Sequence, residues 1–191
     1  LSFAIKPFEA YYVPISPNEI EAKNELKPFI EIFNNQNKTL IGQNVKYDLH
    51  ILKNYNIEIK NKIFDTMIAH FLIKPDMRHN MDVLAETYLN YQPISIETLI
   101  GKKGKDQLSM RDADVHKISD YAAEDADVTL QLKTIFSPEL QKNSVNSLFN
   151  EVEIPLISVL ADMEREGINL DVKALKEFST QLQADIITVD S

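Results

Sequence analysis

The sequence has 191 residues, of which 44% are hydrophobic and 26% charged, which is enough for one globular domain and part of a second. This composition excludes disordered and fibrous proteins, and no apolar run approaches the roughly 20 residues of a membrane span. Without a signal peptide either, the chain is predicted to be soluble, cytosolic and free of membrane contacts. The lack of cysteine excludes disulfides and thiolate zinc sites.

The net charge of -9 is unfavourable for a protein that holds nucleic acid mainly by neutralising phosphates, and it suits an acidic site that binds cations. The four histidines show no short metal-ligand spacing, so ordinary surface or core roles are favoured for them. A metal ion would therefore have to bind oxygen ligands.

The first half of the chain alternates between short apolar runs and helical patterns. Ser16 and Glu19 form a capping-box pattern that predicts the start of a helix, and Pro28 is expected to kink or split it. Asp65 is predicted to cap another helix. This alternation predicts an α/β fold. The expected elements are strands over 1–5 and 10–15, a strand over 39–42, a helix over 44–54, a strand over 57–64 and a helix over 66–73.

The second half is predicted to be helical. One apolar stripe begins at Met81, and a longer helix is expected over 115–136, ended or interrupted by Pro138. Residues 142–147 are interpreted as a polar linker near a domain boundary. Beyond it, one helix is expected to stop at Gly167 and a second to carry an apolar stripe that needs a packing partner.

Asp48 falls inside the apolar arc of the predicted helix over 44–54. An ionised carboxylate at such a position is costly unless it is paired, hydrogen-bonded or metal-bound. The arc, drawn at about 100° per residue, holds Val45, Tyr47, Leu49, Ile51, Leu52 and Tyr55.

Asp125 likewise lies in the apolar stripe of the helix over 115–136. Tyr121 is one turn before it, so their Cβ atoms are expected about 6 Å apart and both could meet one ligand. For either aspartate the alternative is a structural carboxylate bonded to the backbone or to a lysine. For Tyr121 the alternative is a core residue packed on Leu132. Asp120, Glu124 and Asp127 on the opposite side are predicted to be solvated.

Two segments resemble exonuclease motifs of the bacterial family A DNA polymerases. Residues 42–48 resemble the second motif, and residues 121–130 resemble the third in the tyrosine-bearing variant of the DEDD exonucleases. Residues 64–67, 78–85 and 101–107 are similar to the polymerase version in order and spacing, which disfavours a tRNA-processing relative.

This resemblance implies a ribonuclease H-like (DnaQ-like) exonuclease fold, in which helices flank a mixed sheet, over residues 1–140. Residues 153–160 and 163–168 resemble the opening helices of the polymerase domain, so residues 147–191 are assigned to that domain. The remainder of the polymerase chain is the expected partner.

The resemblance also implies a chemistry. In the family, two divalent ions, Mg²⁺ or Mn²⁺, are bound by an Asp-x-Glu pair on the first strand and by one aspartate from each of the other motifs. Asp48 and Asp125 occupy these last two places, and Tyr121 would orient the attacking water. The expected reaction is hydrolysis of the 3′ terminal phosphodiester of single-stranded DNA with release of a nucleoside monophosphate, as in proofreading during replication and repair.

Further positions are matched by the resemblance to contacts with the single-stranded 3′ end, where stacking and phosphate contacts ignore base identity. For Asn44 the alternative is a plain helix N-cap. Asp65 is outside the family's metal set, and the lysines of the loop over 101–105 either steer the DNA backbone or are merely solvated. The matched DNA-binding positions are Gln43, Asn44, Tyr47 and Arg78.

The Asp-x-Glu pair is the departure from the pattern, because no such pair follows an apolar strand in this sequence and in the family it would precede Leu1. Loss of that central strand would remove two metal ligands and expose two strand edges. We therefore expect weak or absent nuclease activity from this chain, and self-association through the exposed edges and the C-terminal stripes.

Two other functions remain open from the sequence. One is a catalytically inert structural and DNA-positioning module of a family A polymerase, and the other is an RNA-trimming relative from the same superfamily.

Overall fold

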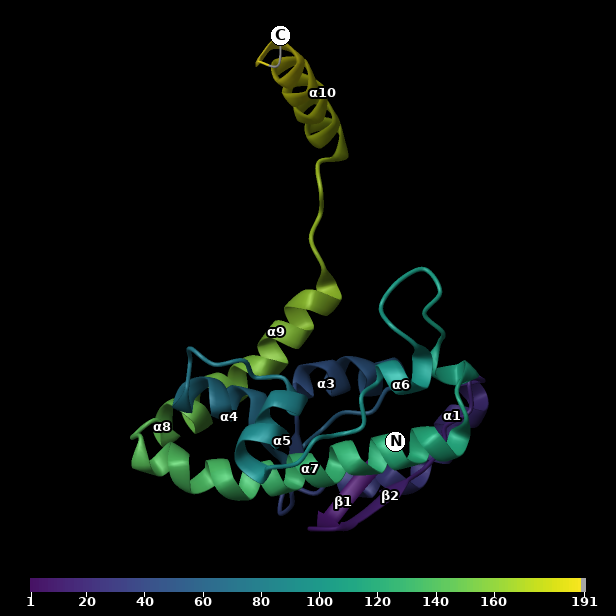
Figure 1. Ribbon diagram of the computed structural model, residues 1–191, viewed down its shortest axis with the longest axis vertical. Helices are drawn as coiled ribbons and strands as arrows, with labels where there is room; N and C mark the ends of the chain where they lie inside the picture. The colour runs from purple at the N-terminus through teal and green to yellow at the C-terminus, as the bar shows by residue number, and fades with distance from the viewer. Residues whose placement is uncertain (190–191) are drawn as a thin grey trace. The chain divides into compact units, whose positions relative to one another are not determined.

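A computed structural model describes residues 1–189 and divides the chain into two compact units, one from Leu1 to Ala161 and one beginning at Asp162. Within the described range, no helix is long and apolar enough to cross a membrane. The first unit contains all the strands of the described range, and its longest helix, α7 (Val115–Lys142), runs along one side of it (Figure 1).

The N-terminal segment forms the predicted hairpin. Strand β1 (Ser2–Lys6) pairs antiparallel with β2 (Glu9–Tyr12), and the turn between them places Phe8 in the left-handed region at φ 66°. The N–H of Phe8 donates to the carboxylate of Asp127 on α7 at 2.7 Å. Asp127 was predicted to be solvated, but it anchors the hairpin tip to α7.

The second sheet is parallel. Strand β3 (Thr39–Gly42) matches its predicted bounds and pairs with β4 (Lys62–Asp65), so that Gly42 lies opposite Asp65. The strand predicted over 57–64 is shorter than expected, because its first residue, Ile57, is buried against the end of a helix instead, where its N–H donates to the Leu52 carbonyl. The strands described thus form two separate two-stranded sheets rather than one continuous mixed sheet.

The first helix begins later than the capping-box pattern predicts. Asn18, not Ser16, is the N-cap, because the Asn18 side chain accepts the N–H groups of Ile20 and Glu21, while the Ser16 hydroxyl accepts the N–H of Asn18. Pro28 splits the helical segment as predicted. The elements of this region are α1 (Glu19–Leu26), the 3₁₀ turn η1 (Lys27–Phe29) and α2 (Ile30–Phe33).

Helix α7 continues through Pro138, contrary to the prediction that it ends or is interrupted there. The physical reason is burial on both sides of the proline, since Phe136 and Leu140, one turn apart, are 0% and 1% exposed. Packing of this stripe offsets the hydrogen bond that proline removes. The remaining helices are α3 (Val45–Asn54), α4 (Thr66–Ile73), α5 (Met81–Leu89), α6 (Glu97–Ile100) and η2 (Met110–Asp112).

The main core lies where α4 and α5 pack on α7. Phe149 belongs to this core and its ring lies 5.0 Å from that of Phe64, so the compact unit continues past the predicted linker over 142–147. Ile157 and Ala161 are also buried, against α3. The elements of this segment are α8 (Asn146–Leu148), the π-helical turn η3 (Phe149–Glu153) and α9 (Ile154–Glu166).

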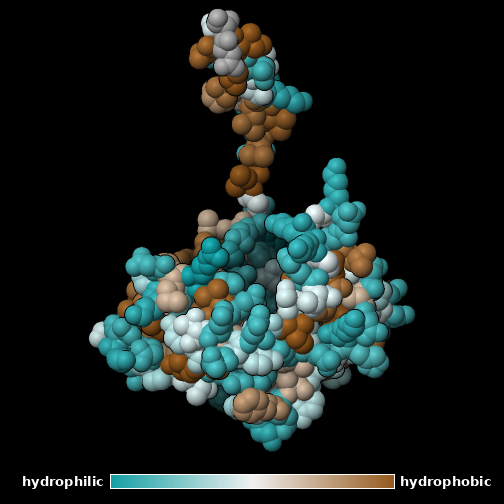
Figure 2. Space-filling view, in the orientation of Figure 1, coloured by the Kyte–Doolittle hydropathy of each residue, from teal (hydrophilic) through white to brown (hydrophobic). Residues whose placement is uncertain are grey.

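The second unit consists mainly of α10 (Val172–Val189), preceded by Gly167, whose φ of 78° ends α9 as predicted. No described residue of α10 is buried, and its apolar stripe is exposed; hydrophobic residues cover much of this unit in Figure 2, whereas hydrophilic residues dominate the visible face of the first unit. The assignment of residues 147–191 to a polymerase domain stays a prediction.

Candidate active site

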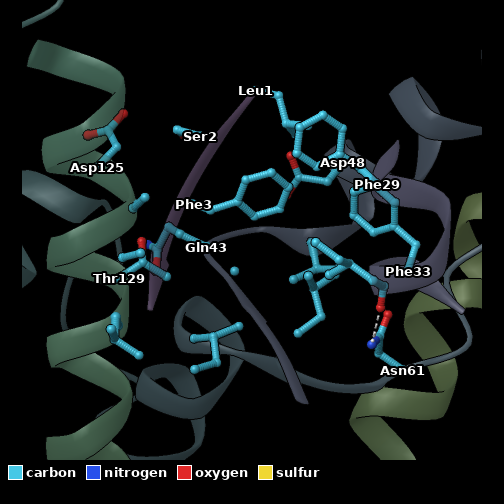
Figure 3. A pocket seen from close by; sticks show the side chains of 18 of the residues that line it. Leu1, Ser2, Phe3, Phe29, Phe33, Gln43, Asp48, Asn61, Asp125 and Thr129 are labelled. Atoms are coloured by element: carbon cyan, nitrogen blue, oxygen red, sulfur yellow. Dashed lines mark hydrogen bonds between the residues drawn. The ribbon is translucent and has the colours of Figure 1, made fainter. Parts of the chain in front are cut away.

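A cavity of about 720 Å³ lies in the first unit, and residues of β1 and β3 are among those that line it. Most of its wall is apolar, with side chains such as Phe3, Phe33 and Leu52. Two carboxylates, Asp48 from α3 and Asp125 from α7, also line it, and Figure 3 shows them on different sides of the cavity. The structure therefore brings the two predicted metal ligands to one space.

Asp48 lies on the cavity side of α3. The sequence places Asp48 inside an apolar arc of this helix, but only part of that arc is buried. Val45 is 1% exposed, whereas Tyr47 and Ile51 are 63% and 42% exposed. Part of the arc that surrounds Asp48 therefore faces away from the core. Although Asp48 is exposed as a whole residue, partial burial of its carboxyl, followed by repulsion from Asp65, raises its pKa to about 6.

Asp125 and Tyr121 lie together on α7, as their spacing predicted. Burial raises the pKa of Asp125 to about 6; the hydrogen bond with Tyr121 opposes this rise, and the nearby carboxylates of Glu124 and Asp82 add to it. Burial and the Asp125 carboxylate raise the pKa of Tyr121, so its hydroxyl remains protonated. It can donate a hydrogen bond to Asp125.

Gln43 is held at both ends of its side-chain amide. Its Nε2 donates to the carbonyl of His79 at 2.7 Å, and its Oε1 accepts from the hydroxyl of Thr66. Thr66 is buried at the start of α4, and Gln43 also lines the cavity. Gly42, just before it, leaves room for the turn into α3, since a Cβ there would lie 2.6 Å from Cγ2 of Val45.

Asp65 caps α4 as predicted, and it also caps α3. Its carboxylate accepts the N–H groups of Met67 and Ile68 at 2.9 and 3.1 Å, and those of Val45 and Asn44 at 2.7 and 3.4 Å. Burial raises the pKa of Asp65, and these four hydrogen bonds oppose the rise. Its side chain therefore joins the two helices that border the site.

Asn44 occupies the N-cap position of α3 but does not cap it. Its backbone is left-handed, at φ 64°, and its side chain makes no capping hydrogen bond, because Asp65 has taken over that role. Tyr47 and Arg78 are both exposed, and neither lines the cavity. Of the four predicted DNA-binding residues, the structure thus brings Gln43 to the cavity and leaves three on the surface.

Comparison with known proteins identifies the family. The profile of the 3′-5′ exonuclease family of A-type DNA polymerases matches residues 1–141. The chain belongs to this family. It is 37% identical to DNA polymerase I of Borreliella burgdorferi over 92% of its own length, and 32% identical to DNA polymerase I of Pseudomonas aeruginosa over 100% of it. The alignments cover 19% and 22% of those two relatives, so the chain spans about a fifth of their length.

The two carboxylates at the cavity are ligands of the type that a hard cation prefers. Mg²⁺ is often held by one or two carboxylates together with waters and phosphate oxygens, and Asp48 and Asp125 offer two carboxylates to one cavity. No group of three or more histidine, aspartate or glutamate side chains within residues 1–189 is arranged to hold a metal ion. Any further ligands have to come from water, from substrate, or from groups outside this sequence.

Sequence reasoning missed several polar residues around the site. Glu124 was predicted to be solvated, yet its carboxylate accepts the Tyr91 hydroxyl and, at 2.7 Å, the N–H of Ile94. His70 is buried and contacts His79, the residue that holds Gln43. A polar residue inside the apolar run of α4 was the signal that could have drawn attention to His70. Asp120 is exposed, as predicted.

Proposed function

We propose that this chain is the proofreading exonuclease region of a bacterial DNA polymerase I, which hydrolyses the 3′ terminal phosphodiester of single-stranded DNA and releases nucleoside monophosphates. The observation that carries the proposal is the cavity that Asp48 and Asp125 share, with Tyr121 one helical turn from Asp125. Membership of the 3′-5′ exonuclease family supports it.

Each site residue then has a role. The carboxylates of Asp48 and Asp125 would hold two divalent ions, Mg²⁺ or Mn²⁺. Such ions, when bound, activate the attacking water and stabilise the leaving 3′ oxygen. The Tyr121 hydroxyl orients the water, because its partner Asp125 fixes its direction. The 3′ end is bound without regard to base identity by Gln43, Asn44, Tyr47 and Arg78.

We further propose that residues 1–191 alone have weak or no nuclease activity. The family resemblance implies four carboxylate ligands, whereas within residues 1–189 two carboxylates, those of Asp48 and Asp125, line the cavity. β1 and β3 belong to different sheets and both line the cavity, and we propose that the expected Asp-x-Glu strand would pair with both. A strand in that place would complete both the sheet and the ligand set.

The test is degradation of a 5′-labelled single-stranded DNA in Mg²⁺, followed on a sequencing gel. We compare residues 1–191 with a longer product of the same gene that includes an upstream Asp-x-Glu strand. The longer protein is expected to shorten the DNA from its 3′ end, and Asp48→Ala and Asp125→Ala to slow it by roughly 100-fold or more. Asp120→Ala, an exposed carboxylate on the same helix, is the matched control and is expected to have no effect. Rapid degradation by residues 1–191 would overturn the expectation of weak activity.

A second candidate is an inert module that positions DNA for the polymerase. The absence of a three-donor metal group within residues 1–189 favours it. A longer gene product that lacks the Asp-x-Glu pair, and that binds single-stranded DNA without cutting it, would decide for the inert module. Preferential trimming of RNA in the same assay would instead indicate an RNA-processing relative.

We also propose that the isolated chain self-associates. Among the strands of residues 1–189, β1 pairs with β2 alone and β3 with β4 alone, so each has an edge at which another strand could pair, and the α10 stripe is exposed. Sedimentation at increasing protein concentration is expected to show a rising average mass. A mass that stays monomeric at the highest concentration would contradict this proposal.

A further inference from the structure

Two histidines join helix α4 to the segment that carries Arg78. His70 is 0% exposed, and its Nδ1 lies 2.7 Å from Nδ1 of His79. Its other ring nitrogen, Nε2, lies 3.0 Å from the hydroxyl of Tyr88, and its ring packs against Phe136 with centroids 5.4 Å apart. Both nitrogens of this buried ring are therefore satisfied, and neither reaches the cavity carboxylates.

In the segment over residues 74–80, His79 is the residue whose side chain is partly buried. Every other residue of this segment is exposed, including Arg78, its immediate neighbour. The His79 ring contacts His70 and packs edge-on against Phe71, with centroids 5.6 Å apart. The position of Arg78 therefore depends on how firmly His79 is held.

The backbone of His79 connects the histidine pair to the site. Its carbonyl accepts the Nε2 of Gln43, while the hydroxyl of Thr66 contacts the other end of the same amide. Thr66 and His70 are one turn apart on α4 and so share a face of that helix. One face of α4 thus fixes Gln43 from both sides, directly through Thr66 and indirectly through His70 and His79.

We propose that His70 is a positioning residue for binding of single-stranded DNA, acting through His79 to fix the Gln43 amide and the segment that presents Arg78. This inference rests on the proposed function, in which Gln43 and Arg78 contact the 3′ end. Rigid placement of binding groups strengthens binding because less freedom is lost when the ligand arrives.

The protonation states of His70 and His79 allow a stable hydrogen bond between the two rings. Two Nδ1 atoms in contact need one proton between them, so one ring donates and the other accepts. The Tyr88 hydroxyl can donate or accept, so it accommodates either tautomer of His70. Burial, with repulsion from His79 and Lys74, lowers the pKa of His70 to about 4, which keeps the contact free of a second proton at neutral pH.

The binding test uses a fluorescein-labelled oligothymidylate with the 191-residue chain in EDTA, where no cleavage occurs, and reads anisotropy. His70→Phe keeps the ring packing but removes both hydrogen bonds, and His79→Ala removes the other ring. Each is expected to weaken binding about tenfold. Tyr88→Phe, which leaves the histidine contact in place, is the matched control and is expected to stay within about twofold of the unmodified chain. Arg78→Ala combined with His70→Phe is expected to be less than additive, because both act on one binding element.

A second measurement follows the Gln43 side-chain amide directly by ¹⁵N NMR. Its resonance is expected to shift and its hydrogen exchange to quicken about tenfold in His70→Phe and in His79→Ala, but not in Tyr88→Phe. Unchanged amide signals in both histidine variants would overturn the inference, and so would unchanged DNA binding in those variants when Arg78→Ala weakens it. If the chain does not bind the oligothymidylate, or if Arg78→Ala binds it normally, the proposed DNA contacts of Gln43 and Arg78 are wrong. The amide signals then still decide whether His70 positions Gln43. If His70→Phe does not fold, His79→Ala still tests the inference, because His79 is only partly buried.

Discussion

Replacing Asp65 with alanine is expected to lower the free energy of unfolding by about 2–4 kcal/mol. Its carboxylate accepts two N–H groups at the start of α3, from Asn44 and Val45, and two at the start of α4, from Met67 and Ile68. Loss of one helix cap costs about 0.5–2 kcal/mol, and this single side chain caps two helices. Because Asp65 is 1% exposed, water cannot readily replace the missing acceptor.

Asp114→Ala provides the matched control for this change. Asp114 is exposed and caps α7 alone, through the N–H groups of His116 and Lys117, so its loss is expected to cost about 0.5–1 kcal/mol. Urea unfolding followed by circular dichroism measures both variants, and Asp65→Asn, which keeps one acceptor oxygen, is expected to fall between them. A loss from Asp65→Ala no larger than that from Asp114→Ala would refute the double-cap argument.

Two further changes test other parts of the structure. Gly42→Ala is expected to lower the free energy of unfolding by about 1–3 kcal/mol, because the added Cβ would lie 2.6 Å from Val45 Cγ2; Gly104→Ala, which meets no atom within 4 Å, is expected to be neutral in the same urea assay. The stability advantage of the unmodified chain over His70→Phe is expected to shrink by about 2 kcal/mol between pH 7 and pH 5. The pKa of His70 falls from 6.5 to about 4 on folding, so in this interval the unfolded chain binds a proton that the folded chain does not. The cavity carboxylates are present in both proteins, so their contributions to the pH dependence cancel. A stability difference between the two proteins that does not change with pH would contradict the lowered pKa of His70.

The elements that sequence predicted best are those whose ends depend on neighbouring residues. The bounds of α4 follow from the Asp65 cap and an apolar run, and β3 from a short apolar run before Gly42. Helix α7 passes Pro138 because Phe136 and Leu140 are buried by partners from other parts of the chain. Such long-range packing leaves no local signal, so the proline was misread.

In the candidate site, too, local spacing was predictable from sequence and long-range contacts were not. The i, i+4 spacing was sufficient to place Tyr121 beside Asp125, because both belong to one helix. A helical wheel could not say which half of the α3 arc meets the core, and Tyr47 and Ile51 of that arc are exposed. The partners of His70 are 9 and 18 residues away on other elements, and no spacing rule connects them.

Helix α4 holds the parts of the site in register although it supplies no proposed metal ligand. Its N-cap Asp65 caps the helix that carries Asp48, and its own residues Thr66 and His70 hold Gln43 and His79, respectively. All three side chains are at most 1% exposed, so each would leave an unpaired polar group in the interior if its partner moved. A shift of α4 would break all three contacts together, because they share one rigid element. The buried polar face of α4 therefore couples the metal-binding side of the proposed site to its DNA-binding side, and damage to one contact is expected to disturb both.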